Sequence, residues 1–240
     1  VRANGASASA YLRHGGGGGR VAISYTTSTY TGTFSAAGGT SSQGRAGFPG
    51  TFSFPDNTNL NVNDGAVAST PTTLSAAGIA LAPGTYNIPN LTVTNNAVLF
   101  MQGDNDGTPT NGSGVIINAT TITIDAGAKI SADSLGFTAQ AGPGGGPFYS
   151  GGTYGGKGWG NADATYGSAT QPTALGSGSS SRSGGGAIKL DVTGILTNNG
   201  TISANGGSNS GGGSGQSAAS GGSVWLIANT LAGSGSVLAN

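Results

Sequence analysis

The residues that could carry out chemistry in this 240-residue chain are few, and the clearest group is a pair of aspartates. Asp104 and Asp106 flank Asn105 and are followed by Gly107. This arrangement matches part of a calcium-binding loop, in which carboxylate and amide oxygens are ligands and the glycine makes the turn. A complete loop also needs a bidentate acid further along the chain, and none follows. Ca²⁺ bound at Asp104 and Asp106 is therefore one interpretation, and a plain turn is the other.

Catalysis is not indicated by the other reactive side chains. His14 is the single histidine, and the chain contains no Cys and no Glu. Nucleophile–base triads and zinc sites need such partners, so the sequence predicts neither. Pairs of carboxylates can hydrolyse glycosides, but apart from Asp104 and Asp106 the eight acidic residues are scattered. We therefore expect no enzyme activity, no catalytic residue and no cofactor beyond the candidate Ca²⁺.

Glycine runs at 15–19 and 144–146 could be mistaken for phosphate-binding loops. No Gly-Lys-Ser/Thr follows either run, and no helix is expected behind them to direct a dipole at a phosphate. Glycine also lets backbones approach closely, and this is the simpler interpretation. We expect the long runs to pack as polyproline-II segments against the strands.

Four asparagines begin an Asn-x-Ser/Thr sequon and are candidate sites of N-glycosylation. In a chain rich in Asn and Thr, chance alone generates several such matches. The four residues are Asn90, Asn111, Asn118 and Asn199.

The composition limits the fold class. Glycine accounts for 49 residues and charged side chains for 7% of the chain, whereas ordinary domains contain about 7% glycine and about 25% charged residues. Without glutamate and with few lysines, long helices are nearly excluded. The hydrophobic 35% forms short β-branched clusters bounded by Gly, Asn and Ser. This pattern favours many short strands and argues against disorder of the whole chain.

The charge balance narrows the choice of partners. The formal net charge is zero, and without a basic patch we expect no nucleic-acid partner. No apolar run approaches the roughly 18 residues of a membrane span, so none is predicted. The absence of cysteine rules out disulfides. Richness in Thr, Asn and Gly with low charge is typical of secreted bacterial surface proteins, which predicts an extracellular or cell-surface location.

A repeated pattern organises the chain. The segment Gly184–Leu190 is echoed by Gly221–Ile227 and by Gly17–Ile23. Each copy joins a glycine run to a strand of alternating apolar residues, then to a tight turn and to a short second strand. Such passes bury few apolar residues economically when each stacks on the previous one, so the sequence predicts an all-β, parallel β-solenoid. The residues expected to be buried are Val21, Ile23, Ile122, Ile124, Ile130, Ile188, Leu190, Val192, Ile202, Val224, Leu226 and Val237.

The stretch Gly194–Gly206 resembles the coil repeat of filamentous-haemagglutinin-type adhesins, which fold as right-handed parallel β-helices. The alternation of such coils with long glycine loops is also similar to glycine-rich modules of very large bacterial surface proteins. The resemblance is clear over 184–240, fair over 15–40 and 86–133, and absent elsewhere. It implies a right-handed β-helix and brings no catalytic residue with it.

The domain organisation follows from these repeats. We expect residues 1–240 to form a single β-solenoid domain or one period of a longer repeat array. Residues 40–75 are expected to be an irregular insertion or an edge-strand segment. The glycine- and aromatic-rich loop 141–186 is expected to fold back on the flank and cover its aromatic side chains, or to contact a neighbouring subunit. The aromatics concerned are Tyr149, Tyr154 and Trp159.

The two ends of the sequence are alike. Val1–Gly5 matches Ile202–Gly206, and Val237–Asn240 matches the same element. Either the chain is one period of a longer polypeptide, or separate chains join end to end by adding strand to strand. The predicted partner is in both cases another copy, joined through the chain ends and the glycine- and aromatic-rich loops.

Three functions fit these expectations. The first is an extracellular structural protein, the building block of a surface fibre, sheath or adhesin stalk. An alternative is a β-solenoid that binds ice or glycans through Thr residues at 92–94 and 120–123, although outward Thr ladders do not recur at every repeat of the sequence. A second alternative is a polysaccharide-degrading β-helix.

Overall fold

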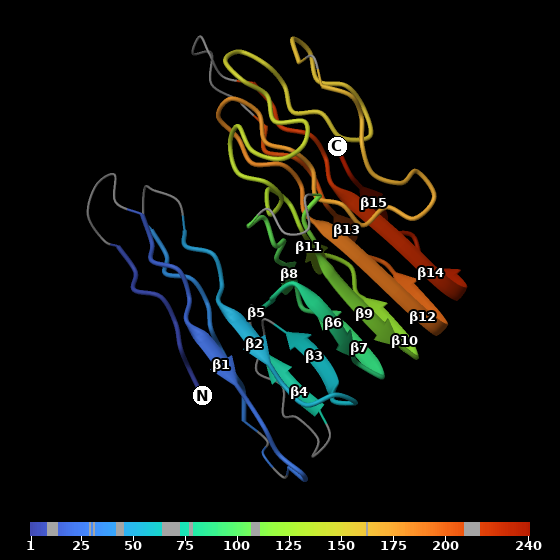
Figure 1. Ribbon diagram of the computed structural model, residues 1–240. Helices are drawn as coiled ribbons and strands as arrows, with labels where there is room; N and C mark the ends of the chain where they lie inside the picture. The colour runs from blue at the N-terminus through green and yellow to red at the C-terminus, as the bar shows by residue number, and fades with distance from the viewer. Residues whose placement is uncertain are drawn as a thin grey trace.

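The computed structural model consists of β-strands and irregular segments, and the described residues include no helix. All pairings between its named strands are parallel. The N-terminus lies beside the first strand and the C-terminus beside the last, at opposite ends of the array (Figure 1). The structure describes residues 1–8, 14–28, 30, 32–41, 46–63, 73–76, 79–106, 111–161, 163–208 and 217–240.

The described residues form fifteen strands, where apolar and polar residues alternate between turn residues. Most are three to five residues long, while two in the C-terminal half are longer. The strands are β1 (Arg20–Ala22), β2 (Thr51–Ser53), β3 (Asn59–Asn63), β4 (Thr73–Ala76), β5 (Ile79–Leu81), β6 (Gly84–Asn87), β7 (Asn90–Thr94), β8 (Val98–Met101), β9 (Val115–Ala119), β10 (Thr121–Ile124), β11 (Lys129–Ser131), β12 (Ala187–Asn198), β13 (Thr201–Ser203), β14 (Ser223–Ala232) and β15 (Ser236–Leu238).

The strands form two parallel sheets. The first has seven strands in the order β1-β2-β5-β8-β11-β13-β15. The second has eight, with the order β4-β3-β7-β10-β12-β9-β6 and β14 paired to β12. From β5 onward the chain returns to the first sheet after every one or two strands of the second sheet, so that segments far apart in the sequence become neighbours.

The long strand β12 pairs with two partners in succession, and its pairing with β14 shifts register between Val192 and Ile195, where the second sheet bends. Its residues up to Val192 pair with β9, and those from Leu196 pair with β10. Between them, Gly194 N donates to Thr120 O at 3.0 Å, and Thr120 N donates to Pro89 O at 2.8 Å. Hydrogen bonding therefore continues around the bend, and the sheet becomes a half-barrel.

This layout corrects the predicted fold. The expectation of a right-handed parallel β-helix, and with it the resemblance to filamentous-haemagglutinin-type adhesins and to glycine-rich surface modules, is wrong. The strands are grouped into two parallel sheets, one of them curled into a half-barrel. A two-residue alternation reports which side chains point inward, but it is the same in any sheet with one buried face. The all-β class is confirmed for the described residues.

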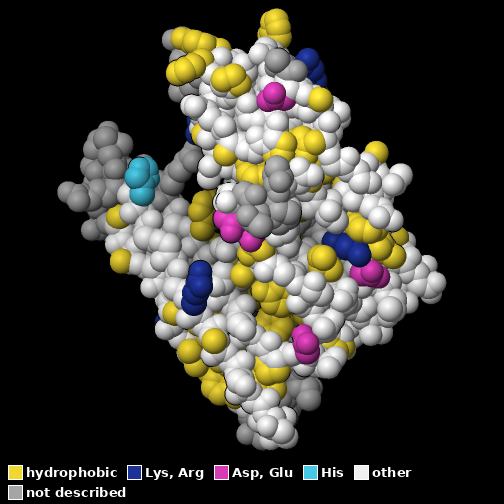
Figure 2. All heavy atoms as spheres, viewed as in Figure 1, with side chains coloured by type: hydrophobic (Ala, Val, Ile, Leu, Met, Phe, Trp, Pro, Cys, Tyr) yellow, Lys and Arg dark blue, Asp and Glu magenta, His cyan; other side chains and the backbone are white. Residues whose placement is uncertain are grey.

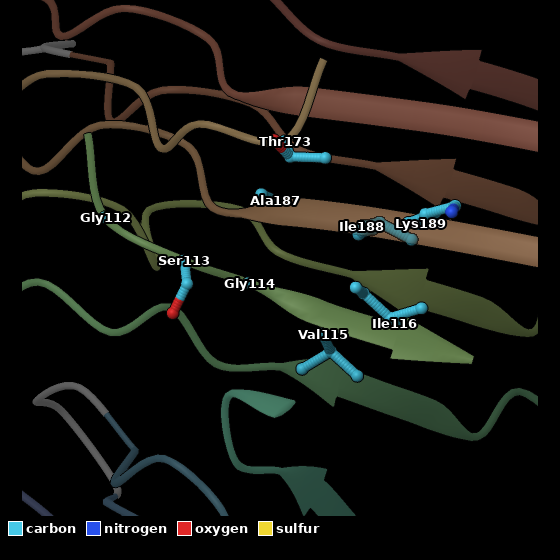
Figure 3. A pocket seen from close by; sticks show the side chains of 9 residues that line it. All are labelled: Gly112, Ser113, Gly114, Val115, Ile116, Thr173, Ala187, Ile188 and Lys189. Atoms are coloured by element: carbon cyan, nitrogen blue, oxygen red, sulfur yellow. The ribbon is translucent and has the colours of Figure 1, made fainter. Parts of the chain in front are cut away.

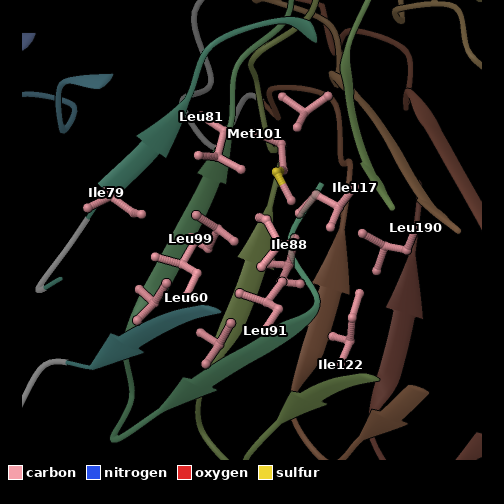
Figure 4. Packing of buried hydrophobic residues seen from close by; sticks show 14 of the residues in the cluster. Leu60, Ile79, Leu81, Ile88, Leu91, Leu99, Met101, Ile117, Ile122 and Leu190 are labelled. Atoms are coloured by element: carbon pink, nitrogen blue, oxygen red, sulfur yellow. The ribbon is translucent and has the colours of Figure 1, made fainter. Parts of the chain in front are cut away.

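One hydrophobic core is shared by strands of both sheets (Figure 4). In the second sheet Leu60, Leu91 and Ile122 stand in register on neighbouring strands, and each is at most 1% exposed. In the first sheet Leu99 and Ile130 form an equivalent ladder. Stacking like side chains at the strand spacing of about 4.8 Å excludes water from both neighbours at once.

Most of the predicted core is confirmed, and the exceptions lie at its ends. Ile23, Val224 and Leu226 are only partly buried, and the prediction is wrong for Val237, which is 47% exposed. The prediction holds for Val21, Ile122, Ile124, Ile130, Ile188, Leu190, Val192 and Ile202.

Glycine-rich segments outside the strands pack side by side at one end of the molecule (Figure 1). Gly176 N donates to Gly185 O at 2.8 Å, and Gly185 N donates to Ser220 O at 3.0 Å. A Cβ atom at Gly176 would overlap the carbonyl oxygen of Gly221. The close backbone approach expected of glycine is therefore confirmed, and it explains why larger residues are excluded from these positions.

The glycine- and aromatic-rich loop at 141–186 is covered only in part. Tyr154 is buried and its hydroxyl lies 2.6 Å from Ser223 Oγ, as predicted for this ring. Tyr149 and Trp159 are 68% and 87% exposed, so the flank does not cover them, and their contact with a neighbouring subunit stays a prediction. Tyr149 has a positive φ of 63°, which turns the backbone outward at this point.

Residues 40–75, the expected insertion or edge segment, contain β2, β3 and most of β4. The chain between them is described only in part. β4 stands at one end of the order of the second sheet.

The first prediction concerns close packing of glycine. We expect Gly176→Ala to lower the free energy of unfolding by about 1–3 kcal/mol, because the added methyl group overlaps backbone. Gly155→Ala is the matched control, since a Cβ there meets nothing within 4 Å. Urea denaturation measures both. Equal stabilities would contradict the packing described here.

The second prediction concerns pH. Burial raises the pKa of Tyr166 from 10.0 to about 12, opposed by the hydrogen bond with Ser177 and assisted by Tyr154. The Tyr166 hydroxyl therefore stays protonated to a higher pH in the folded state than in the unfolded state. Its contribution to the stability of the fold is fully present below pH 10 and is lost as the pH rises toward 12.

Thermal melting at several pH values checks this. Tyr166→Phe should flatten the loss of stability between pH 10 and 12. A residual slope is expected from Tyr86, whose pKa is also raised by burial. Identical slopes for the wild type and the variant would refute the assignment.

Candidate functional site

The aspartate pair lies in a turn beside a short antiparallel bridge. Asp104 N donates to Ser113 O at 2.7 Å, and Asp106 N donates to Asp104 Oδ1 at 3.3 Å. The Asn105 amide donates to Gly136 O at 3.0 Å. No group of three or more His, Cys, Asp or Glu occurs in the described part of the chain. The Asp104 carboxylate thus accepts a bond from the Asp106 backbone, and Ca²⁺ at Asp104 and Asp106 stays a prediction.

An apolar pocket lies where β9 and β12 begin (Figure 3). It has a volume of about 280 Å³ and is lined by residues that include Val115, Ile116 and Thr173. Its only ionisable lining residue is Lys189, whose Nζ lies 3.5 Å from Asp191 Oδ2 and 4.3 Å from the centre of the Trp225 ring. The pocket therefore offers apolar surface without an acid–base pair.

His14 is exposed, and the described surface carries few and scattered charges (Figure 2). None of the described segments forms a helix that could cross a membrane.

Asparagine side chains form ladders across neighbouring strands. Asn90 Nδ2 donates to Asn59 Oδ1 at 2.9 Å, and Thr121 Oγ1 donates to Asn90 Oδ1 at 2.7 Å. The same geometry recurs where Asn118 Nδ2 donates to Asn87 Oδ1 at 3.0 Å. In each pair the later strand donates and the earlier strand accepts.

This direction extends to bonds between side chain and backbone in the first sheet. Asn205 N donates to Asp133 Oδ1 at 2.8 Å, and Asn240 N donates to Asn205 Oδ1 at 2.9 Å. Near the other end, Ala37 N donates to Asn4 Oδ1 at 3.1 Å. The ladders therefore run in one direction along the molecule.

Sequence reasoning assigned asparagine to corners and missed these ladders. The signal was present in the recurring Ala-Asn and Ala-Asp that follow the short strands. Two sequon residues, Asn90 and Asn118, use their amide nitrogens in ladders. Asn111 and Asn199 are exposed, and Asn199 Oδ1 accepts a bond from Ser234 N at 3.4 Å. Glycosylation of the four stays a prediction.

The threonine pattern also becomes clear only in three dimensions. Thr92, Thr123 and Thr197 stand in register on β7, β10 and β12. Asn61 precedes them and Ala232 follows. An outward Thr ladder therefore does exist over three strands, although it ends before the edge of the sheet.

The core is open at both ends of the strand array. Val237 stands in register with the buried Ile202, and Leu231 with the buried Leu196, yet they are 47% and 63% exposed. They continue inward ladders that no further strand of the described segments covers. At the opposite end Val1 is 61% exposed. These two open ends are the candidate assembly surfaces.

Comparison with known proteins assigns no family, because no family model, curated protein or solved structure matches the chain. Function is therefore inferred from the geometry of the chain itself.

The asparagine ladders generate the third prediction. Asn90→Ala removes one donated and one accepted side-chain bond, so we expect a loss of about 1–2 kcal/mol in unfolding free energy. Asn111→Ala is the control and should stay within about 0.5 kcal/mol of the wild type, because among the described residues only its backbone oxygen accepts a bond. Urea denaturation compares them, and equal losses would argue against a stabilising ladder.

Proposed function

We propose that this protein is an extracellular structural protein that assembles end to end into a surface fibre, sheath or adhesin stalk. The observation that carries the proposal is that the two open ends repeat the same hydrogen-bond geometry. The low charge and the Gly, Asn and Thr content support a cell-surface location, as argued from the composition.

At the C-terminal end, three bonds join the last two strands of the first sheet and their extensions. Ala204 N donates to Leu238 O at 2.9 Å, Gly206 N to Asn240 O at 2.7 Å, and Asn240 N to Asn205 Oδ1 at 2.9 Å. These three hydrogen bonds define the pattern by which one segment of the first sheet pairs with the next.

At the N-terminal end the same three bonds occur. Ala3 N donates to Ser35 O at 2.8 Å, Gly5 N to Ala37 O at 2.8 Å, and Ala37 N to Asn4 Oδ1 at 3.1 Å. The segment 1–5 is thus equivalent to 202–206 in its hydrogen bonding as well as similar to it in sequence.

The equivalence defines a register for a second copy. Successive N–H groups of an extended segment point to opposite sides, so the Asn4 N–H points away from Ser35 and Ala37, toward the outer edge. In the joined copies it would donate to Asn240 Oδ1, and Ala239 N would donate to Arg2 O. The inward Val237 would then be covered by Val1, which closes both open ends of the core.

The C-terminal edge has none of the usual protection against strand pairing. Natural edge strands are commonly blocked by charges or proline. β14 and β15 contain neither. An uncharged edge with exposed inward residues such as Leu231 favours addition of another strand.

The contact joins different surfaces of the two copies, so it does not close on itself and generates a filament. The same end-to-end contact can form between separate chains and between consecutive repeats of one polypeptide. Lateral contacts of the filament are assigned to the exposed aromatics of the glycine- and aromatic-rich loop, Phe148, Tyr149 and Trp159.

A second candidate function is ice binding. It is favoured by the ladder of three uncharged side chains, Thr92, Thr123 and Thr197, on the outward face of the second sheet. Regularly spaced hydroxyl and methyl groups could order water. Thermal hysteresis of the wild type, lost in Thr123→Lys, would support it, and no hysteresis would exclude it.

The fourth prediction tests assembly. Wild-type protein should form elongated particles that lengthen with concentration, measured by light scattering and electron microscopy. Leu231→Lys and Val237→Lys place a charge in the open end of the core and should weaken association at least tenfold.

Ile195→Lys is the matched control. Ile195 is 48% exposed and lies on β12, which is paired on both sides. The Ile195→Lys substitution should therefore leave assembly unchanged. A wild type that stays monomeric at high concentration would sink the proposal.

A further inference from the structure

One asparagine ladder ends in a way that the others do not. Asn87, Asn118 and Asp191 stand in register on β6, β9 and β12. Because Asn118 donates its Nδ2 to Asn87 Oδ1, its own Oδ1 is turned toward the next strand. The side chain on that strand is a carboxylate, which in its ionised form can only accept hydrogen bonds. Two acceptors therefore stand on adjacent strands.

The neighbouring ladder shows how such an end is normally completed. After Asn59 and Asn90, the third strand supplies Thr121, whose hydroxyl donates to Asn90 Oδ1 at 2.7 Å. In the first sheet, backbone N–H groups complete the acceptors of Asp133 and Asn205. Asn118 Oδ1 receives no such donor within the described residues, and because Asn118 is exposed, a hydroxyl group of a ligand can replace the water at this acceptor.

The gap opens into a groove at the bend of the curled sheet. The groove has a volume of about 440 Å³. Its polar lining includes Asn57, Thr120 and Thr193 together with the ladder residues, and Pro89 and Ala119 add apolar surface. A groove of this size with both polar and apolar lining suits a small ligand that has both hydroxyl groups and C–H faces.

The charge of the groove argues against a divalent cation. Asp191 is the single acidic lining residue, and its Oδ2 already lies 3.5 Å from Lys189 Nζ. Ca²⁺ takes six to eight oxygen ligands, with several carboxylates among them in tight sites. A neutral ligand with hydroxyl donors fits the pair of acceptors better.

We propose that this groove binds a neutral saccharide unit. Two of its hydroxyls donate to Asn118 Oδ1 and to the Asp191 carboxylate, and its C–H face lies on Pro89 and Ala119. The site depends on the ladder and the groove alone, so it is independent of end-to-end assembly.

The test uses saturation-transfer difference NMR with four neutral probes: cellotriose, maltotriose, laminaritriose and mannotriose. At least one should give a signal with the wild type. Asp191→Asn supplies an amide donor to Asn118 Oδ1 and fills the gap from within. It should therefore weaken binding at least tenfold and raise the melting temperature at the same time, a pairing that simple damage to the site would not produce.

Two controls separate the site from its surroundings. Thr121→Ala changes the neighbouring ladder, and Lys189→Gln removes the ion pair while keeping the carboxylate. Both should retain binding within about twofold. The proposal is overturned if no probe binds the wild type, if Asp191→Asn binds as the wild type does, or if Ca²⁺ competes with the saccharide.

Discussion

Parallel, in-register pairing is the constraint on which the rest of this structure depends. Each pass of the chain places its inward residues directly over those of the previous pass, as Leu60, Leu91 and Ile122 do in the second sheet. A chain with only 35% hydrophobic residues can build a shared core in this way, because many buried side chains are covered by an apolar neighbour on the next strand. The core has no natural limit along the stacking direction, so its last layers remain open.

The same stacking explains the unusual composition. Between the strands, glycine segments approach one another so closely that a methyl group at Gly176 would overlap a neighbouring backbone oxygen. On the outward faces, asparagine and threonine satisfy one another from strand to strand, which leaves little need for charged side chains. The abundance of glycine and the abundance of asparagine therefore have the same physical reason, which is that backbone positions repeat at the strand spacing.

Direction is the second consequence of parallel pairing. In a parallel ladder every strand presents a different edge to its two neighbours, and the asparagine side chains follow this polarity by accepting from the next strand. Because all ladders have the same direction, one end supplies the Asn4 N–H as a donor and the other end supplies Asn240 Oδ1 as an acceptor. The two ends are therefore complementary, which is the basis of the proposed assembly. It also makes the Asn118–Asp191 pair stand out as a break, which is the basis of the proposed saccharide site.

The sequence by itself determined the all-β class and most inward residues, because alternation and turn chemistry are local properties that Ile188, Leu190 and Val192 display without their partners. Only the tertiary structure decided how strands divide between two sheets and where the second one curls, since the bend at Gly194 depends on bonds to residues far away in the chain. The direction of the amide ladders and the meeting of Asn118 with Asp191 were likewise set by register, which couples distant segments and leaves no local trace in the sequence.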